Sequence, residues 1–185
     1  MFFCLLCNVK FSYFAYNKPQ GVITHSPQNG EKDIKEKIKH QAIPRDVFPI
    51  GRLDKDSHGL IILTNDGRVT DRLLNPDYAH EKEYLVETTN KLRPSFKEYI
   101  EAGVDIGEYV TKKCKVEIKG DSKFSITLGE GKKHQIRRMC VALHNDVSDL
   151  KRIRIMNILL GELKTGSFRP ISGLELSTFL KSLGL

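Results

Sequence analysis

The sequence predicts a single α+β domain built on a largely antiparallel, mixed sheet that is flanked by helices. The expected strands and helices alternate irregularly, without the repeated strand–helix–strand units of a parallel fold. One pair of strand candidates, 110–118 and 123–128, is joined by a short turn, and no internal repeat divides the chain. With 185 residues, of which 39% are hydrophobic and 29% charged, the chain is long enough to bury a substantial core.

The N-terminal elements follow from aromatic residues, turn residues and a helix cap. The aromatic-rich residues 11–16 predict a strand, and Asn17–Gly21 ends it in a turn because Pro and Gly favour turns. Residues 22–24 then resume extended structure. Asp33 is expected to cap a short helix over residues 34–39, whose Lys and Glu side chains face solvent.

The middle of the chain combines a buried strand, two helices and a second strand. The apolar run at 61–63 predicts a core strand, and residues 68–74 predict a helix that ends at Asn75–Asp77. Residues 81–88 predict a strand that places alternate side chains on opposite faces. A further helix is expected over residues 93–102, where a glycine follows it.

The C-terminal third continues with a strand pair and two helices. Residues 110–118 and 123–128 predict two strands that a tight turn joins. Residues 132–144 carry apolar side chains at helical spacing, with basic side chains on the other faces. Residues 150–158 predict another strand, and residues 174–183 a terminal helix.

The charge of the chain points to a polyanionic partner. The net charge is +7 and the isoelectric point is about 9.2. Residues 130–154 contain seven basic and three acidic side chains, and Lys112, Lys113 and Lys115 lie shortly before them. Clustering of this kind favours nucleic acid as the partner, because a face that only confers solubility mixes the two signs more evenly.

The cysteines and the hydropathy pattern indicate a cytoplasmic protein with no membrane span. The four cysteines include one isolated CxxC, at Cys4 and Cys7, without a second pair or nearby histidines, so reduced thiols are expected rather than a zinc site. The apolar N-terminus lacks the basic start and the length of a signal peptide. No stretch approaches the roughly 20 apolar residues of a transmembrane helix.

One loop stands out as a candidate site. Residues 51–60 place Arg52, Asp54 and Asp56 directly before the buried strand, which would hold the loop rigidly from one side. A charged surface turn and a cation site are the competing interpretations. A metal-dependent nuclease would need further carboxylates at ligand spacing, and a nucleobase deaminase would need a zinc-binding signature. The sequence has neither. A single carboxylate that acts as nucleophile or base beside an Arg remains.

Several motifs together resemble a known family. They are GRLDKDSHGLIILTNDG, with NKPQG before it and EKEYLV, TKKCKV, GEGKKHQIRRM and RIRIMNILLG after it. In this order, from Phe11 to the C-terminus, they resemble the RNA pseudouridine synthases of the RsuA-type branch, and most of all the RluF-type enzymes of 23S ribosomal RNA. The resemblance implies a pseudouridine synthase fold, in which the sheet bends around a central RNA-binding cleft.

The resemblance also implies roles for particular residues. Asp54 matches the essential catalytic carboxylate, and Arg52 matches the Arg that holds the target nucleotide out of the stack. Tyr84 matches the Tyr that packs on the uracil, and Arg137 the basic partner of the Asp. Neither metal nor cofactor is required, because the conversion of uridine to pseudouridine, its C-linked isomer, adds and removes no atoms.

The expected RNA contacts come from the basic residues around this site. They are Arg52, Lys112, Lys113, Lys132, Lys133, Arg138 and Arg154. Asp56 is interpreted as a loop-supporting residue, and His134 and His144 as helix-surface residues. The motif that contains Lys18 is explained by its turn, although Lys18 is also a candidate phosphate contact.

The resemblance departs from the family pattern at the start of the chain. Most RsuA-type enzymes carry a small S4-type RNA-binding module before the catalytic domain, and only about ten residues precede the first expected strand here. We therefore expect an extension at 1–10 and a catalytic domain at 11–185, acting as a monomer. A transfer-RNA-specific synthase and a catalytically silent RNA-binding or ribosome-assembly module are the alternative functions.

Overall fold

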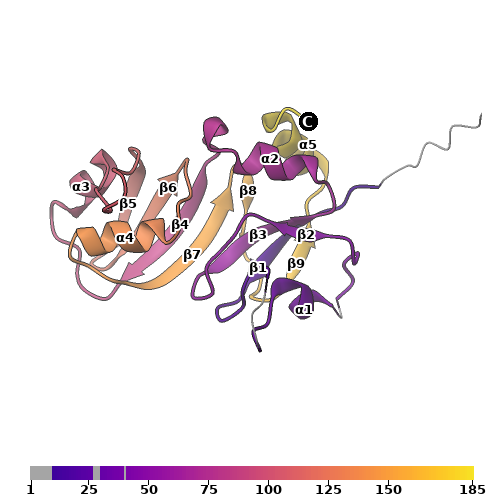
Figure 1. Cartoon of the computed structure of the whole chain (residues 1–185), viewed down its shortest axis with the longest axis horizontal. Coiled ribbons are helices and arrows are strands. Elements are labelled where there is room, and N and C mark those ends of the chain that lie inside the picture. The colour runs from indigo at the N-terminus through magenta and orange to yellow at the C-terminus, as the bar shows by residue number, and fades with distance from the viewer. Residues whose placement is uncertain (1–9, 27–29, 40) are drawn as a thin grey trace, which may run out of the picture.

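A single sheet organises the protein. The computed structural model describes residues 10–26, 30–39 and 41–185, so the CxxC at Cys4 and Cys7 lies outside the described residues. Within them, nine strands form the sheet (Figure 1). The strands are β1 (Tyr13–Lys18), β2 (Phe48–Ile50), β3 (His58–Thr64), β4 (Lys82–Thr88), β5 (Lys115–Gly120), β6 (Lys123–Leu128), β7 (Val147–Ile155), β8 (Ile158–Leu159) and β9 (Phe168–Pro170).

The strand order gives the sheet two halves that meet at one junction. The order is β5-β6-β4-β7-β3-β1-β9, with β2 paired to β3 and β8 paired to β7. Strands β3 and β7 pair in parallel over a short stretch, whereas the other pairings are antiparallel. The predicted largely antiparallel, mixed sheet is therefore confirmed.

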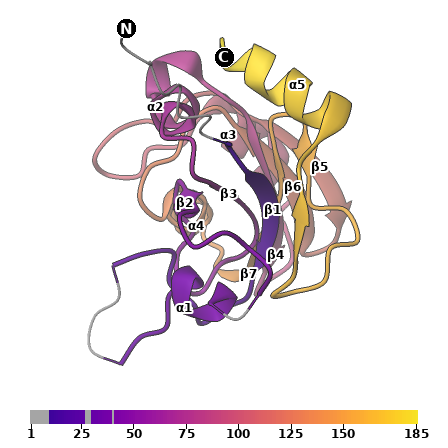
Figure 2. The same cartoon turned by 90° about the vertical axis from the view of Figure 1, so that its right-hand side faces the viewer.

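Helices cover the two halves separately (Figures 1 and 2). One half, around β4 to β7, carries α3 and α4, and the other carries α2 and α5 near one another with α1 on the opposite side. The helices are α1 (Ile34–Ile38), α2 (Arg68–Leu74), α3 (Phe96–Ala102), α4 (Gln135–Ala142) and α5 (Gly173–Ser182), and a 3₁₀ helix η1 (Pro76–Tyr78) follows α2.

Strand β3 is buried on both faces, which explains its continuous apolar sequence. Leu60 and Ile62 belong to the core cluster that includes residues of α2 and α5, whereas Ile61 and Leu63 belong to the cluster that includes α1. Successive side chains of a strand point to opposite faces, so a strand between two layers needs apolar residues at every position. This burial on both sides anchors the loop that precedes β3.

Gly59 permits the close approach of β3 and β7 at the junction of the two halves. It has a φ of +102°, and a Cβ added there would lie 2.3 Å from the backbone oxygen of Arg152. Only glycine fits both the backbone conformation and the contact. The loop before β3 is thereby held against the half that contains β4 and β7.

Several predicted elements have different bounds in the structure, and three of them show why. The first strand continues to Lys18, because Asn17 and Lys18 find partners on β3 where a turn was expected. The strand predicted over 110–118 begins only at Lys115. The strand predicted over 150–158 ends at Ile155, because Met156 adopts a positive φ of 50° and turns the chain into β8.

The helices in the described residues are short. None of them has the length and hydropathy needed to cross a membrane.

Candidate active site

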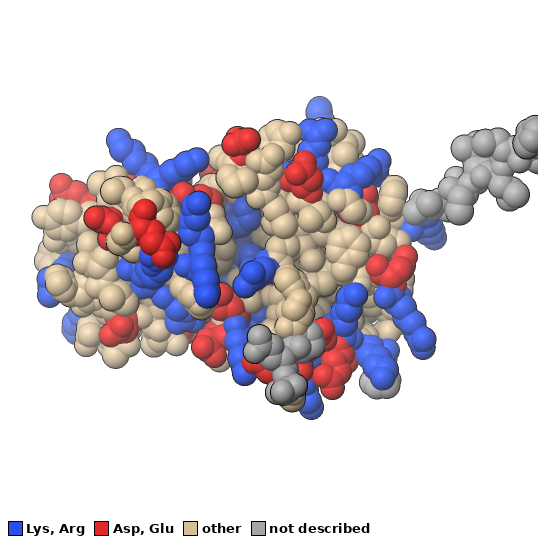
Figure 3. Space-filling model, viewed as in Figure 1, with Lys and Arg blue, Asp and Glu red and all other residues tan. Residues whose placement is uncertain are grey.

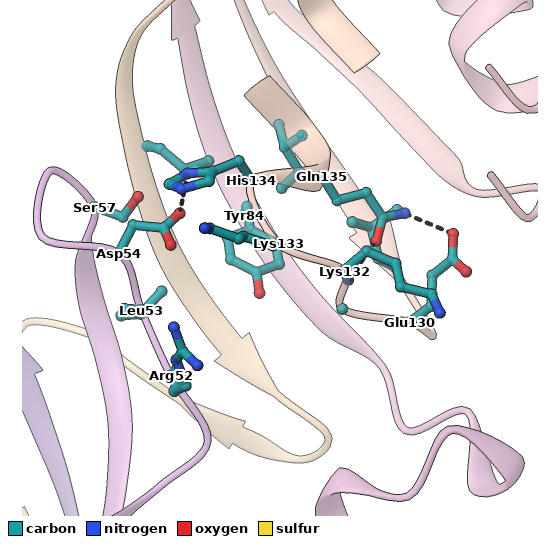
Figure 4. A pocket seen from close by; sticks show the side chains of 14 residues that line it. Arg52, Leu53, Asp54, Ser57, Tyr84, Glu130, Lys132, Lys133, His134 and Gln135 are labelled. Carbon is teal, nitrogen blue, oxygen red and sulfur yellow. Dashed lines mark hydrogen bonds and ion pairs between the residues drawn. The ribbon is translucent and has the colours of Figure 1, made fainter. Parts of the chain in front are cut away.

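A pocket of about 240 Å³ opens between the loop before β3, strand β4 and the start of α4. Arg52 and Asp54 line it from the loop, and Tyr84 lines it from β4 (Figure 4). Lys132 and Lys133 close it from the connection between β6 and α4. The structure thus brings together five of the residues that the sequence predicted for catalysis and RNA contact.

The backbone around Asp54 is fixed by a turn and by a buried threonine. The Ser57 amide donates to the Asp54 carbonyl at 3.1 Å, which closes a β-turn over residues 54–57. The Thr24 hydroxyl accepts from the Leu53 amide at 3.0 Å and donates to the Leu53 carbonyl at 2.9 Å. Asp54 therefore extends from a backbone that is held on both sides, as a catalytic carboxylate requires.

Lys18 supports the same turn from below. Its side chain is fully buried, and Nζ donates to the carbonyl of Ser57 at 2.7 Å and to that of Pro19 at 3.0 Å. Burial lowers the pKa of Lys18 to about 8, while the nearby Asp54 charge opposes this shift. Lys18 is thus not placed to contact phosphate from solvent. This burial was not predicted from the sequence, because lysine is rarely buried.

Arg137 also holds the turn in this structure. Its guanidinium donates to the carbonyls of Val147 at 3.1 Å and Asp56 at 3.3 Å, and to the Ser57 hydroxyl at 3.4 Å. These contacts connect α4 to the loop and place a positive group beside it. The role of Arg137 as the direct charge partner of Asp54 stays a prediction. Asp56 takes part through its backbone carbonyl.

His134 is the side chain that pairs with Asp54. His134 Nδ1 lies 3.2 Å from Asp54 Oδ2, and Figure 4 shows the imidazole turned toward the carboxylate. The residue precedes α4 with a φ of 52°, so the left-handed conformation directs it away from the helix surface that the sequence predicted for it. The helical pattern alone gave no signal for this contact.

A buried pair of polar side chains shapes the connection between β6 and α4. Glu130 Oε1 accepts from Gln135 Nε2 at 2.6 Å and from the Lys112 amide at 3.0 Å. Gln135 Oε1 in turn accepts from the Lys132 amide at 3.0 Å. Both side chains are buried, so this hydrogen-bonded pair fixes the segment that carries Lys132 and Lys133. Neither Glu130 nor Gln135 was predicted from the sequence as a site residue.

The other predicted RNA contacts divide between the site and its surroundings. Lys112 lines a hollow next to the pocket, and Lys113 is exposed outside both. Arg138 donates to the Ile106 carbonyl at 2.5 Å and pairs with Glu108. Arg154 pairs with Glu81 and Glu83, so nearby acids offset its charge. Figure 3 shows Lys and Arg side chains around the central hollow of this face.

The sequence is similar to those of known proteins. Residues 12–142 match the family model described as RNA pseudouridylate synthase. The chain is 43% identical over 168 residues to the dual-specificity RNA pseudouridine synthase RluF of Escherichia coli strain K12, which covers 90% of this chain and 57% of that protein. It is 37% identical over 180 residues to an RNA pseudouridine synthase of Aquifex aeolicus whose name calls it uncharacterized, and this match covers 94% of this chain and 71% of that protein.

The fold agrees with the sequence comparison. A solved structure described as a pseudouridylate synthase superposes with a TM-score of 0.82 at 30% identity, over 94% of this chain and 74% of that one. The chain spans little more than half the length of RluF. The predicted fold and the predicted resemblance to RluF-type enzymes are confirmed. This chain belongs to the RNA pseudouridylate synthase family.

Proposed function

We propose that the protein converts a uridine in structured RNA to pseudouridine, with Asp54 as the catalytic carboxylate. The observation that carries the proposal is the convergence of Asp54, Tyr84 and Arg52 on one pocket with lysines at its rim. A module that only binds RNA needs the basic rim, but it has no use for a carboxylate that is paired with His134 on a turn held by Lys18 and Arg137.

The chemistry fits a carboxylate, an aromatic side chain and no redox group. The bond from N1 to the sugar breaks, the uracil turns, C5 joins the same sugar carbon, C5 loses its proton and N1 gains one. Asp54 serves either by forming an ester with the sugar or by taking a sugar proton to give a glycal-like intermediate. Both routes need the carboxylate ionised, and the surrounding Lys18, Arg137 and His134 supply positive or hydrogen-bonding groups.

Tyr84 and Arg52 have complementary parts in holding the base. A flipped base stacks on an aromatic ring with roughly 1–3 kcal/mol per base. Tyr84 is half-buried on β4, and its ring lines the pocket. Arg52 is exposed at the pocket mouth, where its charge can occupy the position that the base leaves.

Ribosomal RNA is the proposed substrate. The support is the similarity to RluF, which the motifs of the sequence had already indicated. Pseudouridine is mapped in ribosomal and transfer RNA from cells with the gene present, absent, or changed to Asp54→Asn. Asp56→Asn, in the neighbouring exposed carboxylate, is the matched control and is expected to keep the modification.

The map separates the candidate functions. A pseudouridine in ribosomal RNA that depends on Asp54 supports the proposal. A pseudouridine in transfer RNA that depends on Asp54 would show that transfer RNA is the substrate. If no position depends on the gene, the enzyme proposal is wrong. A position that survives Asp54→Asn shows that another group performs the chemistry.

The lysine rim is tested separately through salt dependence. The double variant Lys132→Ala and Lys133→Ala is expected to weaken RNA binding and to lower the slope of log K against log salt by about 1–2. Lys91→Ala, in an exposed lysine paired with Asp121, serves as the control. An unchanged slope in the double variant would remove this rim from the RNA surface.

A further inference from the structure

A second and larger hollow, of about 710 Å³, adjoins the active-site pocket. It lies between the α2–η1 segment, β2, β4 and β7. Arg52, Tyr84, Lys132 and the segment 130–131 line both spaces. A chain of nucleotides with one base in the pocket therefore has a continuous path into this hollow.

The charged side chains of the hollow are mostly cations, and apolar side chains of β2 and α2 surround them. Five cations and one acid, Glu130, line it, and Glu130 already accepts hydrogen bonds from Gln135 and the Lys112 amide. The cations are Arg52, Lys82, Lys112, Lys132 and Arg152. A lining of this composition favours an anion, and the net charge of the chain agrees with a polyanion.

Arg152 is the most informative of these cations. Its side chain is 3% exposed, and it donates from Nε to the Leu60 carbonyl at 2.7 Å and from Nη1 to the Arg52 carbonyl at 3.3 Å. Its Nη2 is buried and has no hydrogen-bond partner among the described residues. A buried donor without a partner is costly, so its presence beside a hollow points to a ligand that supplies the acceptor.

Lys82 is a second cation without an acidic partner. Its Nζ donates to the His80 carbonyl at 2.9 Å, and in the described part of the chain it forms no ion pair with a carboxylate. Burial, and next the charge of Arg152, lower the pKa of Lys82 to about 8. Two cations without acidic partners lower the free energy of unfolding. A loss of stability of this kind is typical of binding sites.

An aromatic wall stands beside the two cations. His80 lines the hollow, and the Tyr78 ring packs behind it with centroids 5.7 Å apart and planes inclined by 23°. Arg72 also lies over the Tyr78 ring, with its Cζ 5.9 Å from the ring centroid. A ring supported in this way offers a flat surface for a nucleobase.

We propose that this hollow is a subsite for the nucleotide next to the isomerised uridine, in which Lys82 and Arg152 bind the phosphodiester and His80 receives the base. The inference rests on the proposed RNA substrate. An inorganic phosphate would fill a small part of the space, whereas a nucleotide linked to the base in the pocket uses the cations and the aromatic wall together.

The test removes the charge of one phosphodiester at a time. The probes are the trinucleotide ApUpA and its two forms with an uncharged methylphosphonate at the 5′ or the 3′ linkage. Binding is measured by calorimetry at low salt for the unmodified protein, Lys82→Gln, Lys82→Arg and the control Lys91→Gln. The Asp54→Asn map is run in parallel.

A defined pattern is expected. One of the two methylphosphonates weakens binding about tenfold in the unmodified protein, in Lys91→Gln and in the charge-preserving Lys82→Arg. Lys82→Gln binds ApUpA about tenfold more weakly and shows no further loss with that methylphosphonate. Its thermal unfolding midpoint is not lowered, because the removed cation has no acidic partner.

Other outcomes overturn the subsite. If Lys82→Gln and the methylphosphonate weaken binding independently, Lys82 does not contact that phosphodiester. Unmeasurable binding of ApUpA to the unmodified protein would also contradict the inference. If either result occurs while pseudouridine still depends on Asp54, the subsite fails and the proposed function stands. If pseudouridine in the RNA does not depend on Asp54, the proposed function itself is wrong.

Discussion

Replacement of the buried Lys18 by Met tests how the structure holds the catalytic turn. Lys18 has no solvent-exposed side-chain surface, and its ammonium binds the carbonyls of Ser57 and Pro19 beneath the turn that carries Asp54. Met fills a similar volume but donates no hydrogen bond. We expect the turn to loosen, so that the carboxylate loses its alignment with the sugar and activity falls about 100-fold.

The lowered pKa of Lys18 gives this prediction a pH dependence. The pKa is about 8 in the folded protein against 10.5 in the ordinary lysine, so the unfolded chain binds more protons between these values. The penalty for burying the charge is fully present below about pH 8 and is lost as the pH rises toward 10.5. From about pH 7 to about pH 9.5 this group adds roughly 2 kcal/mol to the free energy of unfolding.

The assay compares urea unfolding of the two proteins over this pH range. Lys82, whose pKa is also about 8, contributes equally to both and cancels in the difference. The unmodified protein is expected to gain roughly 2 kcal/mol more than Lys18→Met between the two pH values. Parallel stability curves would refute the reasoning, because they would show that Lys18 does not carry a buried charge.

Three further substitutions probe the junction, the base and the carboxylate. Gly59→Ala places a Cβ 2.3 Å from the Arg152 backbone oxygen, so we expect urea unfolding to show a free energy of unfolding lower by roughly 3 kcal/mol or more. An unchanged urea midpoint would contradict the close approach of β3 and β7. Tyr84→Leu is expected to lower kcat/KM about 10- to 100-fold while Tyr84→Phe retains the stacking part, and equal rates for both would exclude a stacking role. His134→Asn tolerates the positive φ and can still donate to Asp54, so it should be more active than His134→Ala by about tenfold, whereas equal activity would make the contact incidental.

Local sequence patterns predicted much of the secondary structure. Residues 68–74 and 123–128 form α2 and β6 with the predicted bounds, and Asp33 caps α1 by accepting from the Glu36 amide at 2.8 Å. These features depend on periodicity, turn residues and caps within a few positions of one another. The first strand was misjudged at Lys18 because its extension depends on pairing with β3, more than 40 positions away.

The candidate site was predicted in part. The motif around Asp54 and the later Tyr84 indicated a shared site, and both line the same pocket. The basic residues could be chosen only by their charge, so Arg154 was ranked with Lys132 although two glutamates pair with it. Charge in a sequence does not show which cations already have acidic partners.

The sequence by itself determined the family, most of the helices and strands, and the candidate carboxylate Asp54, because these depend on short contiguous motifs. Only the tertiary structure decided that Lys18 lies buried under the turn, that His134 faces Asp54 and that Arg152 retains a donor without a partner. The physical reason is that burial and charge pairing depend on all neighbours in space. The junction of β3 with β7 brings those neighbours together from both halves of the chain.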